Sequence, residues 1–315
     1  MLRRSTCGGK PPPPPPPAPD IGELADELLI DSGHLRKIQR LLEDKQQMIF
    51  QGPPGTGKTY VARKLAACLA GNRERVRLVQ FHPSYAYEDF VHGYRPILKG
   101  KRPGFELRPG PLLCMVEQAL KAPDDRHFLV IDEINRGNLA KILGELYFLL
   151  EYRNQQMQLQ YSDEMFALPD NLYVIGTMNT ADRSIALVDL ALRRRFHFVE
   201  FHPDKPPVAG LLRRWLGRHA PRMGWVADVV DRANRELNDR QAAIGPSYFM
   251  KDRLDEEMVG LIWEHNVLPY MEEHLYGEHE RLAQFELEAL GREEGSAGIE
   301  DGRVGDGAEA GDATS

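Results

Sequence analysis

Residues 52–59 have the residue types and the spacing of a phosphate-binding loop, with the pattern G-x-x-x-x-G-K-T. The glycines allow the backbone to fold around phosphate oxygens, and the helix expected to follow directs its positive dipole end toward the anion. Lys58 is expected to reach the β- and γ-phosphates, and the Thr59 hydroxyl to bind Mg²⁺. The predicted nucleotide-binding residues are Gly52, Pro53, Pro54, Gly55, Thr56, Gly57, Lys58, Thr59 and Tyr60.

Two carboxylates, Asp132 and Glu133, directly follow the apolar run at residues 128–131. Such a run is typical of a strand that is buried on both faces of a parallel sheet. We expect Asp132 to hold Mg²⁺, directly or through water, and Glu133 to orient and polarise the attacking water. The second carboxylate favours hydrolysis over a small-molecule kinase reaction.

Asn179 and three consecutive arginines complete the set of candidate catalytic residues. Asn179 follows a predicted strand at residues 172–177, from which its amide can bond the γ-phosphate or the attacking water. The arginines at 193–195 precede another predicted strand and have three readings: a solvated face, a nucleic-acid patch, or a source of charge for a neighbouring subunit's transition state. We favour the third reading, with Arg194 and Arg195 ahead of Arg193.

The elements that position these residues alternate between strands and helices. This alternation predicts an α/β fold with a parallel sheet and a site at its carboxyl edge. One helix is expected to present core residues from 139 to 149, and two hairpins are expected, at residues 95–107 and 155–169. The five predicted strands cover residues 48–50, 76–81, 128–131, 172–177 and 196–201.

Composition suggests four parts of the chain. Residues 1–20 contain an unbroken proline run and are expected to be a disordered linker. Residues 21–202 would form the nucleotide-binding core with a helical lead-in, and residues 203–285, which are helical in pattern, a smaller second domain. Residues 286–315 are expected to be a disordered acidic tail, because 291–315 hold seven acidic residues against two arginines.

Charge and cysteine content exclude several classes of protein. The net charge of the 315-residue chain is -7, most of it in the tail, so no basic excess points to nucleic-acid binding by the core alone. Three scattered cysteines predict neither a disulfide framework nor a zinc site. No apolar run approaches the roughly 20 residues that span a bilayer, and no secretory signal is evident. We therefore expect a cytoplasmic protein with no membrane contact.

These motifs resemble those of AAA+ ring NTPases, and longer strings resemble more narrowly the McrB family, the motor subunits of modified-cytosine restriction systems. The resemblance covers about residues 30–285, and its most specific string is Met-Asn-Thr-Ala-Asp-Arg-Ser at 178–184. The other strings lie at residues 80–85, 88–90, 132–138, 191–196, 244–250 and 268–270.

The resemblance implies an AAA+ core with a five-stranded parallel sheet, an all-helical lid, and a homohexameric ring with Mg²⁺ and nucleotide between subunits. In that family, NTP hydrolysis powers movement on DNA, and a separate McrC-like subunit supplies the nuclease. We accordingly expect no nuclease activity from this chain. Its hairpins would face the pore, where a ring motor engages a partner or a substrate.

The sequence departs from the family pattern at two places. The family's DNA-reading domain precedes the motor, whereas here some 20 linker residues and a helical lead-in stand in that place, so DNA contact is expected through a partner or the pore. Residues 247–249 replace an arginine that many AAA+ relatives direct at the γ-phosphate.

Three functional questions stay open at the level of sequence. ATP and GTP are both possible substrates, because we treat the N-x-x-D spacing of Asn179 and Asp182 as coincidental. A stand-alone ATP-dependent protein remodeller or chaperone is the alternative within the motor class. A nucleotide-gated scaffold that barely hydrolyses is the alternative outside it.

Overall fold

The computed structural model describes residues 20–99, 102–181 and 190–291. Within it the chain divides into two compact units, Met1–Val259 and Gly260–Ser315, each of which is described by itself. The expected proline-rich linker and acidic tail fall almost wholly outside the described residues, as do residues 182–184 of the 178–184 string.

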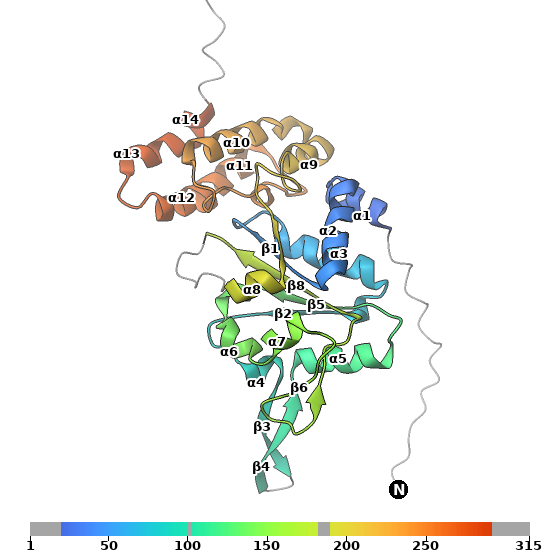
Figure 1. Ribbon diagram of the computed structural model, residues 1–315. Helices are drawn as coiled ribbons and strands as arrows, with labels where there is room; N and C mark the ends of the chain where they lie inside the picture. The colour runs from blue at the N-terminus through green and yellow to red at the C-terminus, as the bar shows by residue number, and fades with distance from the viewer. Residues whose placement is uncertain (1–19, 100–101, 182–189, 292–315) are drawn as a thin grey trace, which may run out of the picture. The chain divides into compact units, whose positions relative to one another are not determined.

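The centre of the first unit is a five-stranded sheet in the order β2-β5-β8-β1-β9, and every neighbouring pair is parallel (Figure 1). This confirms the predicted α/β class. Parallel pairing aligns the carboxyl ends of the strands: Gly52 lies opposite Asn179, and Gln80 opposite Asp132. The strands are β1 (Gln47–Gly52), β2 (Val76–Gln80), β5 (His127–Asp132), β8 (Leu172–Asn179) and β9 (His197–Glu200).

Helices cover both faces of this sheet, because successive strand residues point to opposite sides. Met48 and Phe50 pack into a core with α1 (Ile21–Leu28), α2 (Ser32–Lys45) and α3 (Lys58–Ala70). Ile49, between them, packs into the other core with α5 (Pro111–Lys121) and the short helix α4 (Tyr87–Phe90). A continuous apolar strand sequence is therefore required, as the sequence pattern indicated.

The single helix predicted from residue 139 to residue 149 is wrong in one respect. The structure has two short helices there, α6 (Leu139–Leu143) and α7 (Leu146–Glu151). The chain breaks at Gly144, whose φ of 47° is incompatible with a continuous α-helix. The predicted core positions Ile142, Leu143, Leu146 and Leu149 are buried nevertheless.

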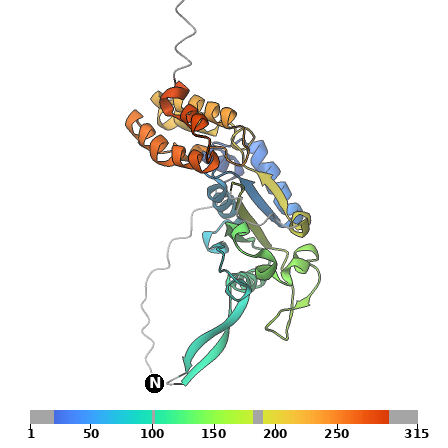
Figure 2. The ribbon, with the colours of Figure 1, turned by 90° about the vertical axis from the view of Figure 1, so that its left-hand side faces the viewer.

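Both predicted hairpins are present. The first, β3 (His92–Lys99) with β4 (Arg102–Pro109), extends away from the sheet (Figures 1 and 2). The second pairs only two residues in each strand, β6 (Met157–Gln158) with β7 (Met165–Phe166). The Tyr161 hydroxyl, in its connecting loop, donates a 2.7 Å hydrogen bond to Glu88 near the root of the first hairpin. The loop of one hairpin is thus fastened to the base of the other.

The region after β9 is mainly helical, with one irregular stretch. The first unit contains α9 (Leu211–His219), α10 (Trp225–Leu237) and then residues 238–255, where only a short 3₁₀ turn, Pro246–Tyr248, forms. Helix α11 (Glu256–Ile262) crosses the boundary between the units. The second unit continues through α12 (Leu268–His274), α13 (His279–Leu282) and α14 (Leu287–Gly291). None of the helices in the described ranges is long and apolar enough to cross a membrane.

A buried glutamine at the start of β1 joins three parts of the first unit. Gln47 is 1% exposed, and its side-chain nitrogen donates to the carbonyl oxygens of Leu150 (2.7 Å) and Arg195 (2.9 Å). Its oxygen accepts a 2.8 Å hydrogen bond from Arg153. Burial lowers the pKa of Arg153 to about 10. The ends of α7 and of α8 (Leu190–Arg195) are therefore tied to the amino end of β1.

The substitution Gln47→Ala should destabilise the first unit, because it removes the side-chain donor to two carbonyls and one of the acceptors of the buried Arg153 guanidinium. Each unsatisfied group costs about 1–3 kcal/mol, so the midpoint of urea unfolding should fall clearly. The matched control is Gln39→Ala, which removes only an exposed hydrogen bond to Glu43. Equal midpoints for the two variants would contradict the role assigned to Gln47.

Candidate nucleotide-binding site

The predicted phosphate loop joins β1 to α3, and Lys58 lies folded into it. The Lys58 side chain is only 6% exposed, and its Nζ donates to the carbonyl oxygens of Gly52 (3.0 Å) and Pro53 (2.7 Å). Burial lowers the Lys58 pKa to about 8, against the opposing attraction of Glu133 and Asp132. The loop thus encloses the Lys58 ammonium group, whose protonation depends on nearby charges.

Three oxygen-bearing side chains meet where β5 and β8 end. The hydroxyls of Thr59 and Thr177 both donate to Oδ1 of Asp132, at 2.6 Å and 2.5 Å. A hydroxyl and a carboxylate oxygen at this separation suit Mg²⁺, which takes few protein ligands and accepts the rest from phosphates and water. Thr177 was not predicted, although it lies two residues before Asn179 and so shares its side of the strand.

Glu133 and Asn179, predicted from separate strands, are in contact. The Asn179 side-chain nitrogen donates to Oε1 of Glu133, and Nε of Arg136 lies 3.4 Å from its Oε2. Glu133 has a φ of 52°, which non-glycine residues seldom adopt. The Asn135 side chain donates to the backbone oxygen of Asn179 at 3.2 Å. Neither Asn135 nor Arg136 was predicted as a site residue, and both belong to the turn that aims the Glu133 carboxylate.

The two favoured arginines lie at the opposite edge of the sheet from this cluster. The Arg195 carbonyl is bonded to Gln47, the first residue of β1, whereas the phosphate loop begins at the last residue of that strand. At about 3.3 Å per residue the strand separates the two places by roughly 17 Å. The fold therefore does not bring the backbone of Arg195 to the phosphate loop of the same chain.

The three arginines also differ in their surroundings. Arg195 is 15% exposed, donates from Nε to the Tyr147 carbonyl at 2.5 Å and pairs with Glu151 at 2.7 Å. Arg194 is 78% exposed and pairs with Glu151 at 3.2 Å. The Arg193 guanidinium lies over the Phe198 ring, 5.2 Å from its centroid. Arg194 thus presents its charge to the exterior, while Arg195 is held inside.

A segment distant in sequence closes over the phosphate loop. The Ser247 backbone nitrogen donates to the Gly55 carbonyl at 2.9 Å. A side chain at Gly245 would place its Cβ only 2.2 Å from the Gly55 carbonyl carbon. Burial raises the pKa of Tyr248, whose ring also lies against Gly55. Where the sequence lacks the arginine of many AAA+ relatives, the structure places backbone and a tyrosine ring.

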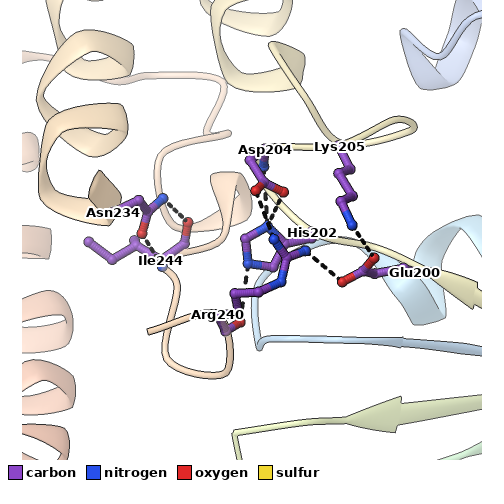
Figure 3. Close-up of polar contacts among 7 residues, drawn as sticks. All are labelled: Glu200, His202, Asp204, Lys205, Asn234, Arg240 and Ile244. Atoms are coloured by element: carbon purple, nitrogen blue, oxygen red, sulfur yellow. Dashed lines mark hydrogen bonds and ion pairs between the residues drawn. The ribbon is translucent and has the colours of Figure 1, made fainter. Parts of the chain in front are cut away.

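Polar contacts hold this segment in place (Figure 3). Arg240 pairs with Glu200 at 2.8 Å and with Asp204 at 3.1 Å, while His202 contacts Asp204 and the Arg240 carbonyl. Asn234, on α10, exchanges two hydrogen bonds with the backbone of Ile244. The segment is thereby anchored both to the end of β9 and to helix α10.

A pocket of about 310 Å³ adjoins the loop. Its walls are largely apolar, which suits the flat face of a nucleotide base. Tyr60 lines it, as does the loop itself through Gly55, Thr56 and Gly57. The helical lead-in supplies Leu28, Leu29 and Ile30, and the region after β9 supplies, among others, Val208, Leu211, Trp215, Pro246 and Ser247.

A parallel sheet with a phosphate loop after β1 and a Thr-Asp-Glu-Asn cluster at its carboxyl edge defines a P-loop NTPase of the AAA+ type. The chain matches the AAA domain of the dynein-related subfamily over residues 47–196 and the McrB alpha-helical lid domain over residues 226–283. It therefore belongs to the McrB-like AAA+ NTPases.

Two curated relatives are components of restriction enzymes. The chain is 37% identical over 292 residues to the type IV methyl-directed restriction enzyme EcoKMcrB subunit of Escherichia coli (strain K12), which covers 84% of this chain and 62% of that protein. It is 26% identical over 307 residues to the type II restriction enzyme BsuMI component YdiS of Bacillus subtilis (strain 168), with 82% and 88% covered. The chain thus spans about three fifths of the E. coli subunit.

Nucleotide affinity should fall as pH rises above about 8. Phosphates favour the charged form of Lys58 and raise its pKa on binding, so affinity is full below the free-state value of about 8. Above it, affinity should weaken about tenfold per pH unit until the bound-state pKa is reached. Titration of a fluorescent nucleotide from about pH 7 to about pH 9 measures this. The control Lys58→Arg keeps its charge and should show a flat profile; an equal slope in both proteins would refute the assignment.

The substitution Gly245→Ala should weaken nucleotide binding. The added methyl group would collide with the Gly55 backbone, so either the phosphate loop or the overlying segment must move. A loss of affinity of about tenfold or more is expected, since loop geometry sets the positions of the N–H donors. Gly217→Ala, where a Cβ meets open space, is the matched control. Unchanged affinity in Gly245→Ala would show that the contact is dispensable.

Proposed function

We propose that this chain is an Mg²⁺-dependent NTP hydrolase whose active site is completed by a second copy. The observation that carries the proposal is the meeting of Glu133 with Asn179 beside the Thr59–Asp132 pair, at the mouth of a phosphate loop. Lys58 and the loop backbone bind the phosphates, and Thr59 and Asp132 hold Mg²⁺, which would neutralise charge developing on the transferred group. Glu133 orients and polarises the attacking water, and Asn179 fixes the Glu133 carboxylate.

An arginine from a neighbouring copy supplies the remaining positive charge. The arginines of the same chain stand at the far edge of the sheet, roughly 17 Å away along β1, yet Arg194 is 78% exposed there. A head-to-tail contact brings that edge of one copy to the loop of the next, and such contacts close into rings when the rotation permits. We propose a homohexameric ring in which Arg194 acts in trans and Arg195 supports it.

The proposed biological role is supported by the relatives rather than by the site. Both are named as parts of restriction enzymes, and 37% identity to the E. coli subunit covers most of this chain. We propose that the ring couples ATP or GTP hydrolysis to DNA translocation and to cleavage by a separate McrC-like nuclease. Contact with DNA would be indirect or through the pore, toward which the two hairpins are proposed to project.

Phosphate release with ATP and with GTP, measured over a range of protein concentrations, tests the catalytic part. Turnover per subunit should rise with concentration, because each site needs a neighbour. Glu133→Gln should lose at least about a hundredfold, and Arg194→Ala a similar or larger factor. Glu117→Gln, which removes an exposed ion pair with Lys121, is the control and should keep full activity. A rate that is independent of concentration, with Arg194→Ala active, would exclude the trans arrangement.

A further inference from the structure

One carboxylate binds both of the favoured arginines. Glu151, the last residue of α7, contacts Arg195 through Oε2 at 2.7 Å and Arg194 through Oε1 at 3.2 Å. Glu151 is not among the residues predicted from the sequence. We propose that Glu151 is a positioning residue for catalysis in trans: it aims the Arg194 guanidinium at the nucleotide of the neighbouring copy. The inference rests on the proposed function, in which Arg194 acts between subunits.

Arg195 gives the carboxylate a fixed base. Its Nε donates to the Tyr147 carbonyl, and its guanidinium lies 5.5 Å from the centroid of the Tyr147 ring. With 15% exposure it has little freedom to move. Tyr147 and Glu151 lie four residues apart on the same helix, so Arg195 contacts both along one side of α7. These contacts hold the Glu151 side chain in one direction.

Arg194, in contrast to Arg195, is mostly exposed, so its side chain needs a contact that fixes its direction. Its side chain is long, flexible and 78% exposed, and an isolated surface ion pair orders such a side chain only weakly. Here the carboxylate is already fixed by a second, nearly buried arginine. Two guanidinium groups share one carboxylate, and the more exposed of the two, that of Arg194, faces outward.

The backbone of this arrangement is held by other groups. Lys45 Nζ donates to the Arg194 carbonyl at 2.7 Å, and the Gln47 amide joins the Leu150 and Arg195 carbonyls. The ends of α7 and α8 therefore stay together without the Glu151 carboxylate. Replacing Glu151 should disturb the direction of the Arg194 side chain and leave the fold and the phosphate loop intact.

The substitution Glu151→Gln is the principal test, because it keeps the shape of the side chain and removes its charge. Turnover of the homogeneous variant should fall about tenfold to a hundredfold, as expected for a displaced catalytic group. Nucleotide affinity and the urea midpoint should match the wild type. Glu151→Ala should show a larger loss of turnover, and Glu117→Gln, a surface glutamate in another ion pair, should show none.

Mixing variants separates a trans role from a local structural one. Glu151→Gln protomers keep an intact phosphate loop and Glu133, while Glu133→Gln protomers keep intact arginines and Glu151. If Glu151 acts across the interface, the mixed ring should hydrolyse faster than the sum of the two proteins measured separately. A mixed rate equal to that sum, with affinity and stability unchanged, would overturn the inference.

A second mixture distinguishes a failure of the role proposed for Glu151 from a failure of the proposed function. Arg194→Ala protomers mixed with Glu133→Gln protomers test the trans arginine alone. If this pair complements and the Glu151→Gln pair does not, only the positioning role of Glu151 is lost. If neither pair complements, the trans arrangement itself is wrong and the inference is refuted with it.

Discussion

Parallel pairing of the strands in fixed register is the constraint on which this active site depends. Glycine at the end of β1 lies opposite Asn179 at the end of β8, and Asp132 ends β5 beside them. Because parallel strands all point the same way, three segments separated by tens of residues deliver their last side chains to one edge. Shifting one strand by a single residue would turn its side chains to the other face and dismantle the cluster.

The same sheet also keeps the arginines away from the cluster. They precede β9, so the chain direction that brings Asp132 and Asn179 to the carboxyl edge leaves Arg195 at the amino edge, bonded to Gln47. A buried amide with three partners stabilises this junction, since each group would be costly to leave unpaired in the interior. Separation within one chain and exposure of Arg194 are the two observations that support the proposed contribution of a second copy.

Closure over the phosphate loop is achieved by backbone contact rather than by a long charged side chain. The Ser247–Gly55 hydrogen bond and the absence of a side chain at Gly245 let two backbones meet directly. The ion pairs around Arg240 fasten the segment to the end of the strand beside the loop. A displacement of this segment would therefore displace the phosphate loop through the backbone contact alone.

The sequence by itself determined the class of sheet, and it indicated the phosphate loop and the candidate residues Lys58, Asp132, Glu133 and Asn179. It could do so because buried parallel strands require continuous apolar runs, and because catalytic groups follow directly where such runs end. The family resemblance supplied the helical lid. These patterns are formed by residues that are close together in the sequence, so they can be recognised without the structure.

Tertiary structure alone decided which side chains meet. Thr177, Arg136 and Glu151 have no distinctive local pattern, and their roles arise from contacts between segments that are far apart in the chain or from an unusual turn. The break at Gly144, which ends α6 and starts α7, likewise escaped the apolar periodicity, because both helices keep the same residues buried. The distinction between an exposed Arg194 and an enclosed Arg195 depends on packing against α7, which adjacent positions in a sequence cannot reveal.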